Sequence, residues 1–358
     1  MLGRAHLISR TLSAATAGSA ARLMRWRVRA LAALLAAMAA ATPGPARAMN
    51  ACANPITACP CAIKSAGDYT ISGPGLIATP PGDCIRVTVP GVTLDLASTI
   101  ISSSPSATAS VGVHVLVGAV GAVIEGALNA PATITGFTTG IEVDAPSVTL
   151  ENLVAQSNNI GIQINAGAAY GSALAVRDSL RTGILINSPH PGPYLSGVSV
   201  DSTLGFAGIE LNGVQGAFLT NVTVTASNTY GVWLRASSRN VIANFAVSQN
   251  TNGGIYLGCF RSGGLLGKRC DTIPPTPPSN GNILTSVGDP STADGPAQPD
   301  QAYGVAIADG NVGNRIVGVE GSGNGRFDAI DGNPNCATNL WTANQFATVN
   351  PAAAGCIH

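Results

Sequence analysis

The sequence predicts an all-β solenoid, a parallel β-helix in which short strands stack coil upon coil. Three observations predict it. The element glycine, apolar residue, any residue, apolar residue aligns in one register at eight positions from Gly112 to Gly304, in steps of 28, 21, 22, 25, 23, 23 and 50 residues. A period in this range is typical of a solenoid. Apolar residues alternate within each repeat, and many are the β-branched Val, Ile and Thr that suit a pleated strand.

Each repeat contains two recognisable parts. The first strand begins at Gly112, Gly140, Gly161, Gly183, Gly208, Gly231, Gly254 and Gly304. A second apolar segment follows, and its third residue is Asn152, Asp178, Gly197, Asn221, Asn244, Ser286 or Gly318. These residue types tolerate left-handed or turn conformations, so we expect a bend there between two short strands. A leucine-rich repeat is excluded because its leucine pattern and helical segment are missing.

With three short strands and three turns per 21 to 25 residues, the chain resembles the right-handed parallel β-helix proteins, the superfold of pectate lyases and polygalacturonases. The resemblance covers about residues 85–330 and implies a single-stranded, right-handed helix of about 9–11 coils. Residues 331–358, from Gly332-Asn-Pro-Asn-Cys336 to Cys356, resemble the closing segment of uncharacterised exported bacterial β-helix proteins. We therefore expect a C-terminal cap there.

Residues 1–48 have the organisation of a secretory signal peptide. Arg25, Arg27 and Arg29 precede an apolar run over residues 30–41, and Ala-Arg-Ala at 46–48 offers a cleavage site. The apolar run is too short to span a bilayer, so we expect an exported monomer, periplasmic or extracellular, without a transmembrane segment. Beyond residue 48, eleven basic and eighteen acidic residues give a net charge of −7, which argues against a nucleic-acid partner.

All eight cysteines follow the signal peptide, and an even number in an exported chain favours disulfides. We expect Cys259 to pair with Cys270 and Cys336 with Cys356. Two further bridges should join Cys52, Cys59, Cys61 and Cys84 within an N-terminal cap of residues 49–84. A metal site at Cys59-Pro60-Cys61 is the weaker alternative, because the spacing differs from that of a zinc site.

Two insertions enlarge the 50-residue step. They cover residues 258–281, which contain the Pro-Pro-Thr-Pro-Pro run, and residues 288–303. Long loops are often functional, and in β-helix enzymes such loops commonly form the walls of the substrate groove. Solvated loops without a ligand are the equally open alternative.

Residues between the apolar positions of a strand point outward. This rule predicts an outer column of His114, Glu142, Gln163, Leu185, Glu210, Trp233, Tyr256 and Ala306. A neighbouring column contains Asp144, Asn165, Asn187, Asn212 and Arg235, and its three asparagines should form a hydrogen-bonded amide ladder. We predict ligand contact at Glu210, Trp233, Arg235 and Tyr256, because exposed aromatic and polar side chains suit sugar rings. Aromatic side chains covered by the insertions between residues 258 and 303 are the equally open alternative.

Another column is predicted on the second strand, with Asp95, Glu125 and Glu151 followed by Arg177. Three stacked carboxylates repel one another unless a cation compensates them. Calcium is therefore a weak possibility at this column, and a solvated acidic face is the favoured interpretation. No other cofactor is expected.

Catalytic residues are harder to find. Glu142 and Glu210 are three coils apart, about 14 Å, which is too far for glycoside hydrolysis. Glu142 with Asp144 forms a possible pair, and His114 beside Glu142 could be an acid–base couple. The Gly-His-Gly and Arg-Ile-Lys motifs of polygalacturonases and the Asp-Pro-His-Glu motif of alginate epimerases are missing.

Three functions stay open at this point. The favoured one is binding of a polysaccharide or cell-surface glycan on the first-strand face, without catalysis. A polysaccharide lyase or glycoside hydrolase is the enzymatic alternative, and a structural or adhesive surface protein is the third.

Overall fold

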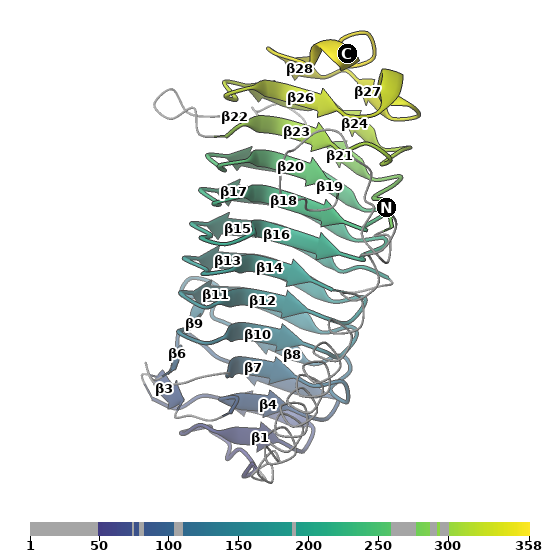
Figure 1. Ribbon diagram of the computed structural model, residues 1–358. Coiled ribbons are helices and arrows are strands. Elements are labelled where there is room, and N and C mark those ends of the chain that lie inside the picture. Colours follow the sequence, from purple (N-terminus) through teal and green to yellow (C-terminus); the bar gives the residue numbers. More distant parts are fainter. Residues whose placement is uncertain are drawn as a thin grey trace, which may run out of the picture. The chain divides into compact units, whose positions relative to one another are not determined.

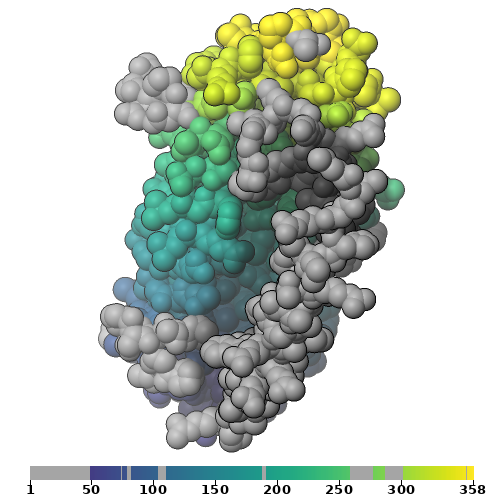
Figure 2. All heavy atoms as spheres, viewed as in Figure 1, coloured from purple at the N-terminus to yellow at the C-terminus, as the bar shows by residue number. Residues whose placement is uncertain are grey.

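The computed structural model describes residues 49–358, apart from residue 74 and the segments 79–81, 104–109, 188–190, 259–276, 287–291 and 294–300. These residues wind into a right-handed parallel β-helix. The front strands run in one direction, the chain crosses to a second sheet behind them, and it returns one layer further along the axis (Figure 1). The colours follow one another in layers from purple to yellow, so each coil packs on the one before it (Figure 2).

One face of the helix is an eleven-stranded parallel sheet, which we call sheet A. In spatial order its strands are β1 (Cys61–Ile63), β4 (Ile85–Val87), β7 (Val111–Val115), β10 (Thr139–Val143), β12 (Ile160–Ile164), β14 (Thr182–Ile186), β16 (Ala207–Asn212), β18 (Tyr230–Arg235), β20 (Gly253–Leu257), β23 (Tyr303–Ile307) and β26 (Phe327–Asp331). Its strand number confirms the predicted range of coils.

The opposite face is a fourteen-stranded parallel sheet, which we call sheet B. Eleven strands form its main path, namely β2 (Gly67–Thr70), β5 (Val92–Asp95), β8 (Val123–Glu125), β11 (Thr149–Gln156), β13 (Tyr170–Arg177), β15 (Tyr194–Asp201), β17 (Phe218–Thr225), β19 (Val241–Ser248), β21 (Ile283–Thr285), β24 (Arg315–Val317) and β27 (Leu340–Thr342). The strands β3 (Gly75–Ala78), β6 (Ile100–Ser103) and β9 (Ala132–Thr135) join it through β11.

The smaller elements lie mostly near the C-terminus. A three-stranded sheet contains β22 (Thr292–Ala293), β25 (Glu320–Ser322) and β28 (Gln345–Phe346). The helical elements of the described chain are two short 3₁₀ turns, η1 (Pro334–Cys336) and η2 (Pro351–Ala353). Within the described residues, no helix is long and apolar enough to cross a membrane.

The recurring glycine has a steric cause. A Cβ atom added at Gly161 would lie 2.6 Å from the carbonyl oxygen of Gly183 in the next coil, closer than side-chain atoms approach a backbone. Gly140 has the same contact with Gly161. In the coils where the glycine recurs, this corner has no room for a side chain, and the repeat unit begins there.

The predicted bends in sheet B are confirmed in most coils. Asn152, Gly197, Asn221, Asn244 and Gly318 have φ angles between 49° and 64°, the left-handed region that these residue types tolerate.

One coil departs from the predicted alignment. Ala173, with φ of 48°, lies opposite Asn152 because β13 pairs Gly171 with Leu150. Placing Asp178 at that bend was wrong, and so was the alignment of Arg177 with Glu151. Arg177 lies between Gln156 and Asp201 instead.

An asparagine ladder lies inside the solenoid at a corner before sheet B. The side-chain amide of Asn240 donates to Asn282, that of Asn282 to Asn314, and that of Asn314 to Asn339, over 3.0 to 3.2 Å. The first three asparagines have no exposed surface. Each amide oxygen also accepts a backbone N–H from the coil before it, which fixes the spacing of successive coils.

Disulfides lie at both ends. Cys52 bonds Cys61 and Cys59 bonds Cys84, as expected of two bridges among these four cysteines. Strands of the solenoid nevertheless extend beyond residues 85–330, since β1 already pairs with β4 and β27 still pairs with β24. The signal peptide, the Cys259–Cys270 pairing and most of both insertions lie outside the described residues.

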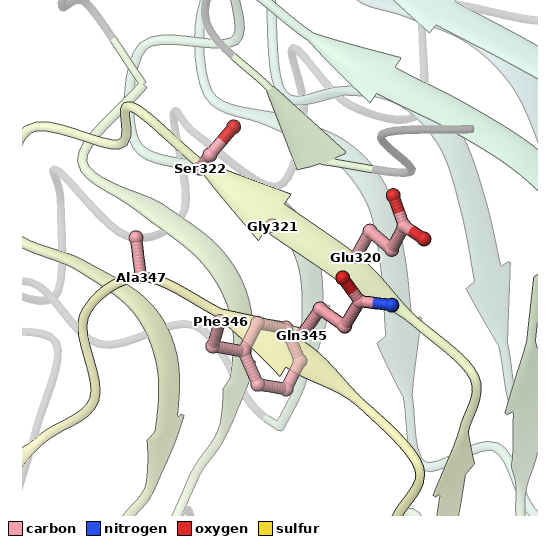
Figure 3. A pocket seen from close by; sticks show the side chains of 6 residues that line it. All are labelled: Glu320, Gly321, Ser322, Gln345, Phe346 and Ala347. Carbon is pink, nitrogen blue, oxygen red and sulfur yellow. The ribbon is translucent and has the colours of Figure 1, made fainter. Parts of the chain in front are cut away.

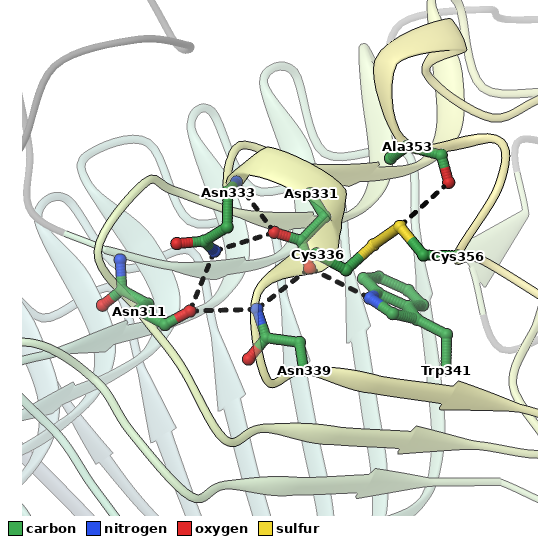
Figure 4. Close-up of a disulfide and its surroundings, with 8 residues drawn as sticks. All are labelled: Asn311, Asp331, Asn333, Cys336, Asn339, Trp341, Ala353 and Cys356. Carbon is green, nitrogen blue, oxygen red and sulfur yellow. Dashed lines mark hydrogen bonds between the residues drawn. A yellow bond between two sulfur atoms is a disulfide. The ribbon is translucent and has the colours of Figure 1, made fainter.

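The C-terminal cap is organised by one buried carboxylate (Figure 4). Asp331 accepts hydrogen bonds from the backbone and side chain of Asn333, from Asn339 and from the Trp341 indole, over 2.8 to 3.0 Å. The predicted Cys336–Cys356 disulfide is confirmed beside it. Asp331 therefore ties the last coil to the chain segment that covers it.

Candidate functional site on the outer face of sheet A

The predicted outer column of sheet A is confirmed in register. Successive strands pair Arg86 with His114, His114 with Glu142, and so on through Gln163, Leu185, Glu210, Trp233, Tyr256 and Ala306. The apolar neighbours on each strand, such as Ile141 and Val143, are fully buried in the core. The alternation of the strand therefore projects the polar residues outward.

His114 lies between two carboxylates. Its Nδ1 atom is 2.9 Å from Asp83 Oδ2, and its Nε2 atom is 2.9 Å from Asp144 Oδ2. Asp83 also accepts a hydrogen bond of 2.6 Å from Arg86 Nε. Burial lowers the pKa of His114, but the hydrogen bonds to the two carboxylates outweigh burial, so the pKa is raised. For Asp83, burial is outweighed by hydrogen bonds from His114 and Arg86, and its pKa is lowered.

Glu142 lies next to this group. Metal-ligating atoms of His114, Glu142 and Asp144 all lie within 4.8 Å of one another. Burial raises the pKa of Glu142, and the neighbouring Asp144 adds to the shift, although His114 opposes it. The structure thus brings together the three weaker candidates of the sequence. Asp83, which sequence reasoning missed, precedes its strand and so lies outside the alternating pattern.

An amide ladder continues from this group. Asn165 donates to Glu142 Oε1 over 3.1 Å and to Asp144 Oδ1 over 2.8 Å. Asn187 donates to Asn165 and Asn212 donates to Asn187, over 3.3 and 3.0 Å. The predicted ladder is confirmed, and the next residue in its column is Arg235.

The predicted ligand-contact residues are adjacent but buried. Trp233 and Tyr256 are paired in register, yet only 3% and 5% of their surfaces are exposed. Tyr230 stacks on Tyr256 at 4.6 Å, and the three rings belong to an apolar cluster outside the main core. Arg235 lies 5.9 Å from the Trp233 ring. The expectation that these aromatics are exposed was wrong, since both rings are buried and each contacts the Tyr230 ring. Most of the insertions that the alternative places over them lie outside the described residues. Ligand contact there stays a prediction.

Glu210 is 8% exposed, between Leu185 and Trp233. Burial raises its pKa, although Arg235 and Arg181 oppose the shift.

On sheet B, Asp95, Glu125 and Glu151 stack in register as predicted. Asp95 Oδ1 accepts the backbone N–H of Ala97, and the next residue after Glu151 is Ser172. Among the described residues, these three carboxylates are not a group whose ligating atoms lie within 4.8 Å of one another. Calcium binding there stays a prediction.

An aromatic ladder on sheet B was missed. Tyr170, Tyr194 and Phe218 stack at 5.2 and 5.3 Å with nearly parallel rings, and 37% to 42% of each residue is exposed. The signal was an aromatic residue at the start of three successive strands. Because each ring covers the face of its neighbour, mostly ring edges remain for a ligand, so we assign this ladder to stacking between coils.

A pocket lies on the small sheet near the C-terminus, between β25 and β28 (Figure 3). Glu320 and Gln345 are paired across these strands, and Phe346 pairs with Gly321. Among the described residues that line the pocket there is one carboxylate and no histidine, cysteine or basic side chain. It belongs to coils far along the solenoid from His114.

No protein-family model matches the sequence, and a sequence search of curated proteins found no match. Solved structures similar to this chain include a bacteriophage CBA120 tailspike protein, with 11% identity and a TM-score of 0.49, over 78% of this chain and 42% of that one. Others are a periplasmic alginate epimerase (14% identity, 78% and 79% coverage, TM-score 0.31) and a pectate lyase (16%, 83% and 70%, TM-score 0.34). The chain spans 42% of that CBA120 tailspike chain and 61% of the Dettilon tailspike chain, less than two thirds of each.

The protein is thus a right-handed parallel β-helix protein, as the sequence predicted. A connected row of polar side chains runs along the outer face of sheet A from Asp83 to Asn212.

Proposed function

We propose that this protein is exported and binds a polysaccharide along the outer face of sheet A. One observation carries the proposal, namely the continuous row of half-buried carboxylates and amides from Glu142 to Asn212, hydrogen-bonded from coil to coil. Planar side chains held in this way present donors and acceptors at one strand spacing, about 4.8 Å. An extended polymer that carries many hydroxyl groups fits such a row. The disulfides at both ends support export.

A glycan array followed by titration of the strongest ligand tests this proposal. Replacing Asn165 and Asn187 by alanine should weaken binding about tenfold, since each amide hydrogen bond contributes about 0.5 to 1.5 kcal/mol. The matched control replaces Ser196 and Thr220 on the outer face of sheet B and should leave binding unchanged. Equal losses in both double variants, or no glycan bound by the wild-type protein, would contradict the proposal.

Hydrolysis of the bound glycan is the second candidate, and the Glu142–Asp144 pair favours it. Their oxygens lie within 4.8 Å, near the roughly 5 Å spacing of retaining glycosidases. A raised pKa suits Glu142 to the role of general acid. New reducing ends that disappear in Glu142→Gln would support hydrolysis, whereas absorbance from unsaturated products would indicate a lyase. Binding without either product leaves the noncatalytic function.

A further inference from the structure

The imidazole of His114 faces more negative charge than a neutral ring can satisfy. A neutral imidazole has one N–H donor and one lone pair. Both ring nitrogens nevertheless lie 2.9 Å from a carboxylate oxygen, Asp83 Oδ2 on one side and Asp144 Oδ2 on the other. One of the two contacts therefore requires a positive charge between nitrogen and oxygen, either a second proton or a metal ion.

The surroundings assign the N–H to Nδ1. Asp83 is held by Arg86 Nε, and its other oxygen accepts the backbone N–H of Val111 over 3.3 Å. It is the more buried of the two carboxylates, with a side chain 10% exposed against 26% for Asp144. A carboxylate fixed in this way accepts the Nδ1 proton, so the Nε2 lone pair points toward Asp144. Histidines that ligate metals have this arrangement, with a carboxylate on the other ring nitrogen.

The two remaining carboxylates each keep one oxygen for an ion. Asn165 donates to Asp144 Oδ1 and to Glu142 Oε1, and Gln163 also donates to Glu142 Oε1. These bonds orient both carboxylates, and among the described residues no hydrogen bond from the ladder reaches Asp144 Oδ2 or Glu142 Oε2. The separation of 2.9 Å between Nε2 and Oδ2 matches adjacent ligands in octahedral coordination with bonds of about 2.0 to 2.2 Å, and a tetrahedral ion needs the two atoms about half an ångström further apart.

We propose that His114 Nε2, Asp144 Oδ2 and Glu142 Oε2 bind a divalent first-row transition ion such as Zn²⁺, with water completing the coordination. Imidazole together with carboxylates suits zinc and its neighbours, whereas calcium and magnesium prefer oxygen ligands alone. The two ligating carboxylates balance the charge of the ion. Among the described residues, this is the one group of three such side chains with ligating atoms within 4.8 Å. Metal binding here does not depend on the proposed polysaccharide binding.

The test uses untagged protein that is treated with a chelator, dialysed and titrated with Zn²⁺ at pH 7.5 by calorimetry. We expect one ion per chain. His114→Gln should abolish binding, and Asp83→Asn should weaken it about 10- to 100-fold, the usual effect of losing an outer-shell carboxylate. Two matched controls, His358→Gln and Glu151→Gln, should bind like the wild type. Absence of zinc binding by the wild-type protein, or full binding by His114→Gln, would overturn the proposal.

A second measurement needs no variant. Co²⁺ bound to the wild-type protein should give a visible absorption band and one exchangeable, paramagnetically shifted imidazole N–H signal, that of Nδ1 hydrogen-bonded to Asp83. Cobalt bound without a shifted imidazole signal would place the ion elsewhere and contradict the proposed ligand.

Discussion

Replacing Asn282 by alanine should destabilise the protein far more than any substitution on the outer amide ladder. Asn282 has no exposed surface. Its side chain accepts from the backbone and side chain of Asn240, both over 3.0 Å, and donates to the Ser237 carbonyl over 2.9 Å and to Asn314 over 3.0 Å. Alanine removes all four bonds in the interior, where water cannot replace them.

Two backbone groups determine how much stability Asn282→Ala loses. The backbone N–H of Asn240 and the carbonyl of Ser237 lose the side-chain partner that the structure gives them, whereas the Asn240 amide keeps its bond to Val214 and Asn314 keeps the backbone N–H of Asn282. A buried group left without a partner costs about 1 to 3 kcal/mol, so the expected loss is about 2 to 6 kcal/mol.

Urea unfolding followed by circular dichroism measures the free energy of unfolding, with Asn187→Ala as the matched control. Asn187 belongs to the half-buried outer ladder, where water replaces the lost bonds, and its loss should cost about 1 kcal/mol or less. Hydrogen exchange at Asn240 should accelerate only in Asn282→Ala. Equal free energies of unfolding for the two variants would refute the idea that the inner ladder stabilises the stacking of coils.

Three further predictions concern single side chains. Thr203→Val should leave the free energy of unfolding unchanged or raise it, because the buried Thr203 hydroxyl has no hydrogen-bond partner among the described residues and Val has the same shape. A loss above about 1 kcal/mol in urea unfolding would contradict this prediction. Glu210→Gln should stabilise the protein at pH 7 but not at pH 4. The pKa of Glu210 is raised in the folded protein, so its ionised form destabilises the fold only when the pH exceeds the pKa of Glu in the unfolded chain. Equal effects at both pH values would exclude ionisation of Glu210 as the cause. In chelator-treated protein, nuclear magnetic resonance should give His114 a titration midpoint above about 6.5, and Asp83→Asn should lower it; an unchanged midpoint would contradict the role of that carboxylate.

The solenoid could be predicted because its determinants repeat. Gly161 and its equivalents are required by a contact with the next coil, and Asn221 or Gly197 by a left-handed backbone, so both recur at a constant period. The alignment failed where Ala173 occupies the bend, since alanine gives no signal for a left-handed conformation. The inner asparagines were missed, because 42 and 32 residues separate Asn240, Asn282 and Asn314, away from the regular period.

The site could be predicted only in part. Alternation and register correctly placed His114 beside Glu142 and Asp144 in the next coil. Asp83 was missed because it lies before β4, where no strand periodicity applies. The exposure of Trp233 was wrong because alternation says which side of a sheet a residue occupies but not what packs over it.

Parallel stacking places equivalent residues of successive coils about 4.8 Å apart, so like side chains tend to follow one another for structural reasons alone. The asparagines of the outer ladder, the rings of Tyr170 and Tyr194, and the inner ladder all obey this tendency. The outer ladder differs from the other two rows in that it is polar, half-buried and hydrogen-bonded to the carboxylates of Glu142 and Asp144. Two outer positions of sheet A break the pattern, since His114 lies between carboxylates and Glu210 lies between an aliphatic and an aromatic side chain. Stacking explains neither, and burial makes the ionised form of Glu210 costly in the folded state, so experiments on function should begin at these two residues.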